Sequence, residues 1–134
     1  MFDALRGRHV LLVDDNELNQ LVAGDLLTEV ASMEVVIAGS GDQALQALQD
    51  GHFDVMLCDV QMPGMDGYEL VRRVRAEPAW AALPIIALTA HASARDRDLC
   101  RAAGMDDYIT KPIRVDALVE ALNHVPSRKD AQDA

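Results

Sequence analysis

The chain has 134 residues, half of them hydrophobic, and 22 acidic against 12 basic residues give it a formal net charge of −10. This length matches one compact domain, and the hydrophobic share is enough for a core without disulfides or a structural metal. The acidic charge argues against a nucleic-acid-binding surface, which needs a basic patch. No apolar run approaches the roughly 20 residues of a membrane span, and no apolar signal-peptide core begins the chain. We therefore expect a cytoplasmic domain that makes no membrane contact itself.

The two cysteines, Cys58 and Cys100, lie far apart in the sequence, and no CxxC pair is present. Cys58 belongs to an apolar run and Cys100 to a helical pattern. We expect both to be reduced residues in or near the core.

Five short apolar runs recur along the chain, and a helical pattern follows each one. They predict strands at residues 9–13, 35–38, 55–58, 85–88 and 107–110. Asn16 can cap the first helix, whose apolar residues have the spacing of one helical face: Leu18, Leu21, Val22, Leu26 and Val30.

The other four helices have similar signals. Ser40 can cap the second helix, which ends near Gly51. The third carries Tyr68, Leu70, Val71 and Val74 on its apolar side, with Arg72, Arg73 and Arg75 outside, and Pro78 stops it. The fourth begins at a Ser93 cap and ends at Gly104, at the position after a helix that glycine favours. Its apolar residues are Leu99, Cys100, Ala102 and Ala103. The last has Val115, Leu118, Val119 and Leu122 as its apolar residues.

Strict alternation of buried strands with amphipathic helices predicts a parallel sheet that is covered by helices on both faces. Right-handed crossovers place the carboxyl ends of all strands at one edge of such a sheet. We expect one domain at residues 9–125, a short polar lead at 1–8 and a polar tail at 126–134.

The strands deliver polar residues to that edge, where open α/β sheets build their sites. The central run ends at Asp59, ahead of a loop containing Pro63 and Gly64. The other candidates are Asp14 and Asp15 after the first strand, Thr89 after the fourth and Lys111 after the fifth.

Each of these residues has an ordinary alternative role, as a turn acid, a helix cap or a surface lysine. As a set they predict more. Three neighbouring carboxylates repel one another, and a divalent cation removes that penalty. Oxygen ligands without His or Cys favour Mg²⁺. With a lysine and a hydroxyl opposite, the cation would neutralise a transferring phosphoryl group, and the central carboxylate can act as its nucleophile.

The motifs LLVDDN, LCDVQMPGMDG, IIALTAHA and YITKPI, in this order, resemble the receiver domain of two-component response regulators, from about residue 8 to residue 125. The resemblance implies a flavodoxin-like, doubly wound (βα)5 fold, a three-layer sandwich whose five parallel strands have the order 2-1-3-4-5.

The resemblance also implies roles for single residues. Asp59 would be the phosphoacceptor, and Asp14, Asp15, Asp59 and the backbone carbonyl of Gln61 would hold Mg²⁺. Lys111 would pair with the phosphoryl group, and Thr89 and Tyr108 would switch conformation with it. The Lys111–Pro112 peptide bond would be cis. Gln61 and His91 occupy positions that tune phosphoryl hydrolysis in the family, although His91 is equally readable as a solvent-exposed loop residue.

The partners implied are a histidine kinase or a histidine phosphotransfer domain, with output through protein contacts of the fourth helix, fifth strand and fifth helix. The pattern VDDNELN with DVQMPGMDG and LTAHA is most similar to receivers of hybrid sensor histidine kinases. The short polar lead and tail suit a domain cut from such a chain. They also suit a stand-alone single-domain response regulator, which stays open.

Three other classes fit less well. An aspartate-nucleophile phosphatase places a second acid two residues after the nucleophile, where this chain has Gln61. A flavin-binding domain needs a phosphate loop after the first strand, where Asp14 and Asp15 would repel phosphate. A pseudo-receiver would normally lack one of the five site residues, and all five are present.

Overall fold

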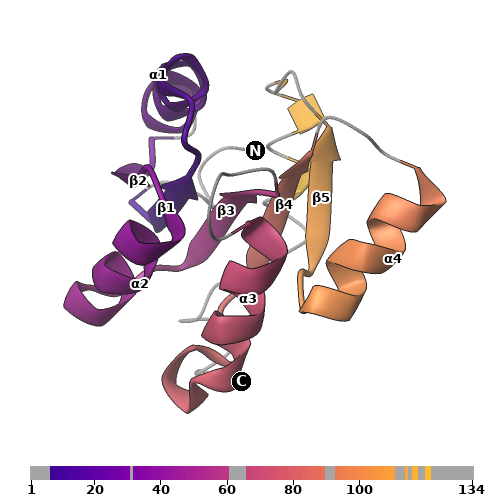
Figure 1. Cartoon of the computed structure of the whole chain (residues 1–134). Coiled ribbons are helices and arrows are strands. Elements are labelled where there is room, and N and C mark those ends of the chain that lie inside the picture. The colour runs from indigo at the N-terminus through magenta and orange to yellow at the C-terminus, as the bar shows by residue number, and fades with distance from the viewer. Residues whose placement is uncertain are drawn as a thin grey trace.

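The structure, a computed structural model, describes residues 7–30, 32–60, 66–89, 93–110, 114, 116–117 and 120–121. Its strands are β1 (His9–Val13), β2 (Glu34–Ala38), β3 (Val55–Asp59), β4 (Ile85–Thr89) and β5 (Asp107–Thr110). They form one parallel sheet in the order β2-β1-β3-β4-β5 (Figure 1). The predicted sheet and its strand order are confirmed.

The helices follow the strands as the sequence predicts. They are α1 (Glu17–Asp25), α2 (Gly41–Asp50), α3 (Gly67–Ala76) and α4 (Ala94–Ala103), with a π-helical turn at Leu26–Val30 and a 3-10 turn at Pro78–Trp80. The side chains of Asn16 and Ser40 cap α1 and α2, and that of Ser93 caps α4. In the region of the predicted last helix, residues 116–117 and 120–121 are helical.

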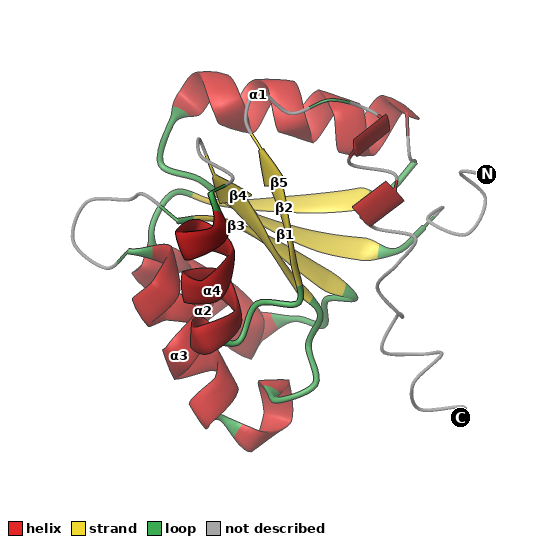
Figure 2. Cartoon of the chain, turned by 90° about the vertical axis from the view of Figure 1, so that its right-hand side faces the viewer, coloured by secondary structure: helices red, strands yellow, loops and turns green. Residues whose placement is uncertain are grey.

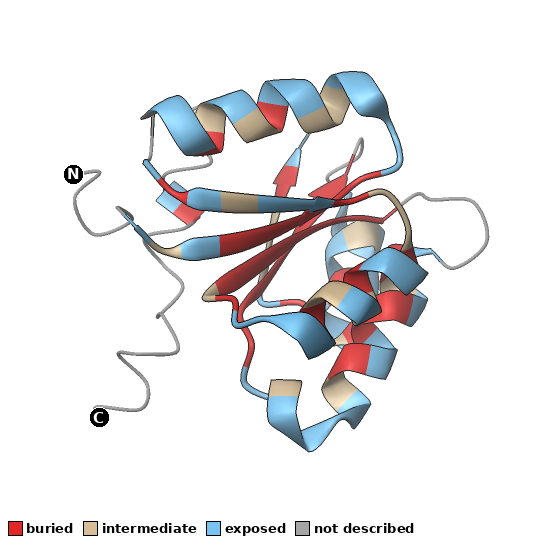
Figure 3. Cartoon of the chain, turned by 90° about the vertical axis from the view of Figure 1, so that its left-hand side faces the viewer, coloured by how far each residue is buried: buried red, intermediate tan, exposed pale blue. Residues whose placement is uncertain are grey.

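The sheet is the middle of three layers. Figure 2 shows α1 along one face and α2, α3 and α4 together on the other. Alternate residues of β1 point to opposite faces, as a strand requires. Leu11 and Val13 join the core under α2, α3 and α4, whereas Val10 and Leu12 join the core under α1. The central strands β3 and β4 are buried along their whole length (Figure 3).

The apolar face predicted for α1 is wrong at its first three residues, although Leu26 packs partly buried against the core under α1. Leu18, Leu21 and Val22 are 67%, 61% and 45% exposed, and the helix buries Ala23 and, in the turn that follows, Leu27. The side of α1 that faces the sheet carries the small residues Ala23 and Gly24. A methyl group added to Gly24 would lie 3.7 Å from Ile37 Cδ1, in ordinary contact.

Two further helix faces differ from the prediction. Arg75, predicted to lie outside α3, turns inward, and its guanidinium donates to four backbone carbonyls. In α4, Cys100 and Ala103 are buried as expected, but Leu99 is 42% exposed and Ala102 is exposed. Within the described residues, no helix combines the length and apolar character needed to cross a membrane.

Candidate functional site

Asp59 is the last residue of the central strand β3, and it is only 3% exposed. Its neighbours on either side along the chain, Cys58 and Val60, are buried as well. The amide of Val60 donates to the carbonyl of Leu88 in β4 (3.1 Å). This hydrogen bond fixes the C-terminal end of β3, which carries Asp59, against β4. Sites of open α/β sheets lie at this end of the strands.

Asp14 and Asp15 follow β1, the neighbour of β3 on the other side. Asp14 is 1% exposed, whereas Asp15 is exposed. The carboxylate oxygen Oδ1 of Asp14 accepts from the amide of Asn16 (2.9 Å), a local turn that aspartate side chains favour. Its carbonyl accepts from the side-chain amide of Gln20 (2.6 Å) in the first turn of α1. These bonds fix the backbone that presents both acids.

The carboxylates of the three acids lie close together. Each of Asp14, Asp15 and Asp59 offers a carboxylate oxygen, and these oxygens lie within 4.8 Å of one another. The group offers oxygen ligands alone, with two buried carboxylates and one exposed. Hard divalent cations prefer such a donor set, and a cation offsets the repulsion between the acids. The residues therefore fit a metal ion of this kind, as the sequence predicts.

Thr89 ends β4 beside this group and is 4% exposed. Its register partner in β5 is Thr110, the residue directly before Lys111 in the sequence. Gln61, His91, Lys111 and Pro112 lie outside the described residues. Their expected parts in the site, including the cis Lys111–Pro112 bond, stay predictions.

Tyr108, the predicted switch residue, lies half-buried in β5. The guanidinium carbon of Arg97 in α4 stands over its ring, 5.6 Å from the centroid, in the range of a cation–π contact. Sequence reasoning missed Arg97, because no pattern within α4 indicates which side chain reaches β5. It also missed Gln20, for the same reason, whereas the Asp14-x-Asn16 turn has a local signal that could have been used.

Cys58 lies directly before Asp59, and its thiol is not a candidate ligand or nucleophile. Burial raises the pKa of the Cys58 thiol strongly, and the nearby charges of Asp59 and Asp14 raise it further. The Sγ atom lies 3.5 Å from the carbonyl oxygen of Asp59, to which the thiol donates. Cys58 and Cys100 are both free and buried, which confirms the prediction of reduced core cysteines.

Comparison with known proteins identifies a family whose model matches most of this chain. A family model described as the response regulator receiver domain matches residues 10–123. The chain is 47% identical over 111 residues to the sensor protein GacS of Pseudomonas syringae pv. syringae, a match that covers 81% of this chain. It spans 12% of the length of that relative.

Solved structures are also similar to this chain. The receiver domain of sensor histidine kinase PA1611 from Pseudomonas aeruginosa PAO1, described with a magnesium ion in its active site cleft, has a TM-score of 0.81 and 37% identity. The match covers 89% of this chain and 97% of that one. The receiver domain of Ssk1 from Saccharomyces cerevisiae, crystallised with the histidine phosphotransfer protein Ypd1, has a TM-score of 0.82. Its identity is 26%, and 91% of this chain and 90% of that one are covered.

Proposed function

The chain belongs to the response regulator receiver domain family, and we propose that Asp59 is the residue that accepts the phosphoryl group. The observation that carries the proposal is that the carboxylates of Asp14, Asp15 and Asp59 lie close together at the C-terminal ends of β1 and β3. The chain is accordingly a signalling module of two-component systems. The alternative of a phosphatase with an external substrate lacks a second acid two residues after Asp59.

In the proposed reaction, a carboxylate oxygen of Asp59 attacks the phosphorus of a phosphohistidine. The new O–P bond makes an acyl phosphate, while the N–P bond breaks and the imidazole leaves with a proton from solvent. Burial of Asp59 keeps bulk water away from the nucleophile. Small donors such as acetyl phosphate react in the same way, with acetate as the leaving group.

We propose Mg²⁺ as the cofactor, held by Asp14, Asp15, Asp59 and the carbonyl of Gln61. It would supply positive charge beside the transferring phosphoryl oxygens. Lys111 is proposed as the second positive charge and Thr89 as the hydroxyl donor to the phosphoryl group. Tyr108 is proposed to change its rotamer after Thr89 moves, which means leaving the contact with Arg97. Gln61 and His91 are proposed to tune hydrolysis.

Acetyl phosphate labelling, followed by intact mass, tests the reaction. The wild type should gain one phosphoryl group with Mg²⁺ and none with chelator, and Asp59→Asn should gain none. Asp54→Asn is the matched control, because Asp54 stands before the amino end of β3, at the opposite end of the strand. It should be labelled like the wild type. Label on a serine, threonine or histidine of the wild type would refute the proposal.

We further propose that the domain belongs to a hybrid sensor kinase and acts in the cytoplasm. Similarity to a small part of the sensor protein GacS supports this origin. The proposed partner is a histidine phosphotransfer domain, because the similar receiver of Ssk1 was crystallised with such a protein.

A phosphotransfer profile tests the partner. The phosphorylated domain should pass its label to the histidine of a phosphotransfer domain and take it back, with Asp59→Asn as the inactive control. A protein that accepts phosphate from a separate kinase and donates to no histidine domain would instead be a stand-alone regulator.

A further inference from the structure

A groove of about 520 Å³ opens at the edge of the sheet opposite to the three acids. One wall is the end of α2, which leads into β3, and the other is the 3-10 turn Pro78–Trp80, which leads into β4. Both segments therefore lie at the amino ends of strands, whereas Asp59 and Thr89 lie at carboxyl ends. The groove is separate from the site described above.

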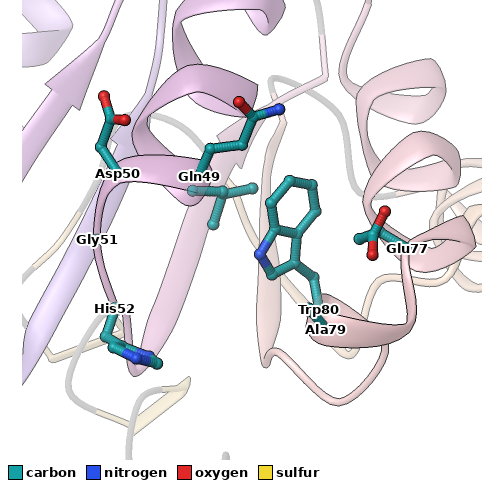
Figure 4. A pocket seen from close by; sticks show the side chains of 8 residues that line it. Gln49, Asp50, Gly51, His52, Glu77, Ala79 and Trp80 are labelled. Carbon is teal, nitrogen blue, oxygen red and sulfur yellow. The ribbon is translucent and has the colours of Figure 1, made fainter.

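The groove combines an apolar base with acidic edges. Leu48 is buried at its base, and Trp80, half-buried, contributes the indole. Figure 4 shows Trp80 standing between Glu77 on one side and Gln49 on the other, with Asp50 beyond Gln49. Among the described residues that line it there is no lysine or arginine.

The backbone adds to this negative character. Helix α2 ends at Asp50 with no basic residue in its last turn, so the partial negative charge of its carboxyl terminus is not offset there. The net charge of −10 would further attract a cationic partner over a distance. An indole face also attracts a guanidinium or ammonium group.

Hydrogen bonds from Arg75 fix the wall of the groove that carries Trp80. The Nη1 atom of Arg75 donates to the carbonyls of Trp80 (3.3 Å), Ala81 (3.1 Å) and Leu83 (2.6 Å). The amide of Trp80 in turn donates to the carbonyl of Glu77 (3.0 Å). Because the turn is fixed before any ligand arrives, binding does not have to order it.

We propose that this groove binds an extended basic peptide segment of a partner protein. Pockets for small molecules enclose most of the ligand's surface. Six of the residues that line this groove are instead exposed, namely Gln49, Asp50, Gly51, His52, Glu77 and Ala79. Glu77 and Asp50 lie on opposite sides of Trp80, and Oδ1 of Asp50 accepts from the side-chain amide of Gln46 (3.1 Å). Glu77 and the other carboxylate oxygen of Asp50 are therefore the acidic groups at the rim of the groove. Alternate residues of an extended peptide share a face, which allows an apolar side chain at Leu48 and Trp80 with a basic one on each side.

Trp80 is the only tryptophan of the chain, so its fluorescence reports directly on the groove. The probe is the peptide acetyl-Arg-Gly-Leu-Gly-Arg-amide, titrated into the full chain and followed in parallel by calorimetry. We expect a saturable change in Trp80 fluorescence that matches the saturable heat. The peptide acetyl-Gln-Gly-Leu-Gly-Gln-amide, equal in length but uncharged, should bind at least several-fold more weakly.

Two exposed acids are the test variants. Asp50→Asn and Glu77→Gln should each weaken binding of the arginine peptide by about twofold to fivefold, as for exposed charge pairs. Asp25→Asn is the matched control, since Asp25 is exposed at the end of α1 and its replacement changes the net charge equally. It should bind like the wild type.

Three results would overturn the proposal. The first is no saturable heat or fluorescence change at millimolar peptide. The second is saturable heat without a change at Trp80, which places the peptide elsewhere. The third is equal weakening by Asp25→Asn and by the two groove variants, which shows attraction by net charge alone. Circular dichroism of each variant confirms that it is folded.

Discussion

Gly67, the first residue of α3, lies directly against the backbone of Asp59. A Cβ atom placed on Gly67 would collide with the carbonyl oxygen of Asp59 and with Cα of Val60 (2.7 Å). The amide of Gly67 also donates to the carbonyl of Val60 (3.2 Å). Helix α3 therefore starts in backbone contact with the end of the strand that carries the proposed phosphoacceptor, and only glycine allows this approach.

The first prediction is that Gly67→Ala lowers both stability and phosphorylation. The obstacle is backbone, which cannot turn aside as a side chain can, so we expect a loss of about 1 to 3 kcal/mol in the free energy of unfolding. Displacement of the end of β3 should also slow labelling by acetyl phosphate. Urea unfolding and intact mass measure the two effects.

Gly24→Ala is the matched control for this substitution. Gly24 lies within α1, and its added methyl would meet only Ile37 Cδ1 at 3.7 Å. Alanine is the better helix former, so this variant should gain about 0.5 to 1 kcal/mol. Equal effects of the two variants would contradict the steric account.

The second prediction concerns Arg75, whose side chain is 20% exposed. Besides the three carbonyls of the α3–β4 connection, it donates through Nε to Gly104 (2.9 Å) and through Nη2 to Asp106 Oδ2 (3.0 Å). Asp106 Oδ2 also accepts from the amide of Ile85 at the start of β4 (2.8 Å). One guanidinium thus joins α3, the end of α4 and the starts of β4 and β5.

Arg75→Ala should cost about 2 to 3 kcal/mol in urea unfolding, because partly buried carbonyls and a carboxylate lose their charged donor. Arg75→Lys should recover little, since one ammonium group cannot serve partners that point in several directions. Arg73→Ala is the control. Its exposed pair with Glu69 (3.2 Å) is worth only about 0.3 to 0.5 kcal/mol. If Arg75→Ala lowered the free energy of unfolding no more than Arg73→Ala, the hydrogen bonds of the Arg75 guanidinium would not contribute to stability as predicted.

The sequence predicts the strands and the N-caps of the helices well, because the signals for both are local. Buried parallel strands leave continuous apolar runs, and Asn16, Ser40 and Ser93 are cap residues by their own chemistry. The three acids could be assembled from sequence for a different reason. Right-handed connections bring the ends of parallel strands to one edge, whatever the helices between them look like.

Faces of helices are harder to predict, because they depend on packing partners far away in the sequence. In α1 the spacing of Leu18, Leu21 and Val22 is as helical as that of Ala23 and Leu27, and only the sheet decides between them. The charge of Arg75 predicts an outward side chain, but its partners come from the α3–β4 connection and from the end of α4. The groove beside Trp80 has no sequence signal, since its walls meet only in the folded chain.

The third prediction is a loss of stability at alkaline pH through Cys58. Burial raises the pKa of its thiol far above the ordinary value of 9.0, and it raises the pKa of Tyr68 from 10.0 to about 12. Above pH 9 the unfolded chain releases protons that the folded chain keeps. For Cys58 the stabilisation is therefore complete below about pH 9 and declines as pH rises above it, by up to about 1.4 kcal/mol per pH unit.

Cys58→Ala tests this account by urea unfolding at pH 8 and pH 10. The variant loses core packing at both values, but its further loss between them should be about 1 kcal/mol smaller than that of the wild type. Ala87→Gly is the control, because it also reduces a fully buried side chain of the same core without removing a titratable group. A Cys58→Ala profile parallel to the wild type would refute the assignment.

The last prediction is that removal of Mg²⁺ destabilises the folded chain through its three acids. The carboxylates of Asp14, Asp15 and Asp59 repel one another within 4.8 Å, and a bound cation both offsets this and adds stability by mass action. At ten times the dissociation constant the gain is about 1.4 kcal/mol, a rise of roughly 4 °C in Tm. Asp15→Asn should melt higher than the wild type in chelator, because one repelling charge is gone, yet gain little from Mg²⁺. Asp54→Asn, at the other end of β3, should keep the full wild-type gain. A wild-type melting curve indifferent to millimolar Mg²⁺ would remove the metal from the proposed mechanism.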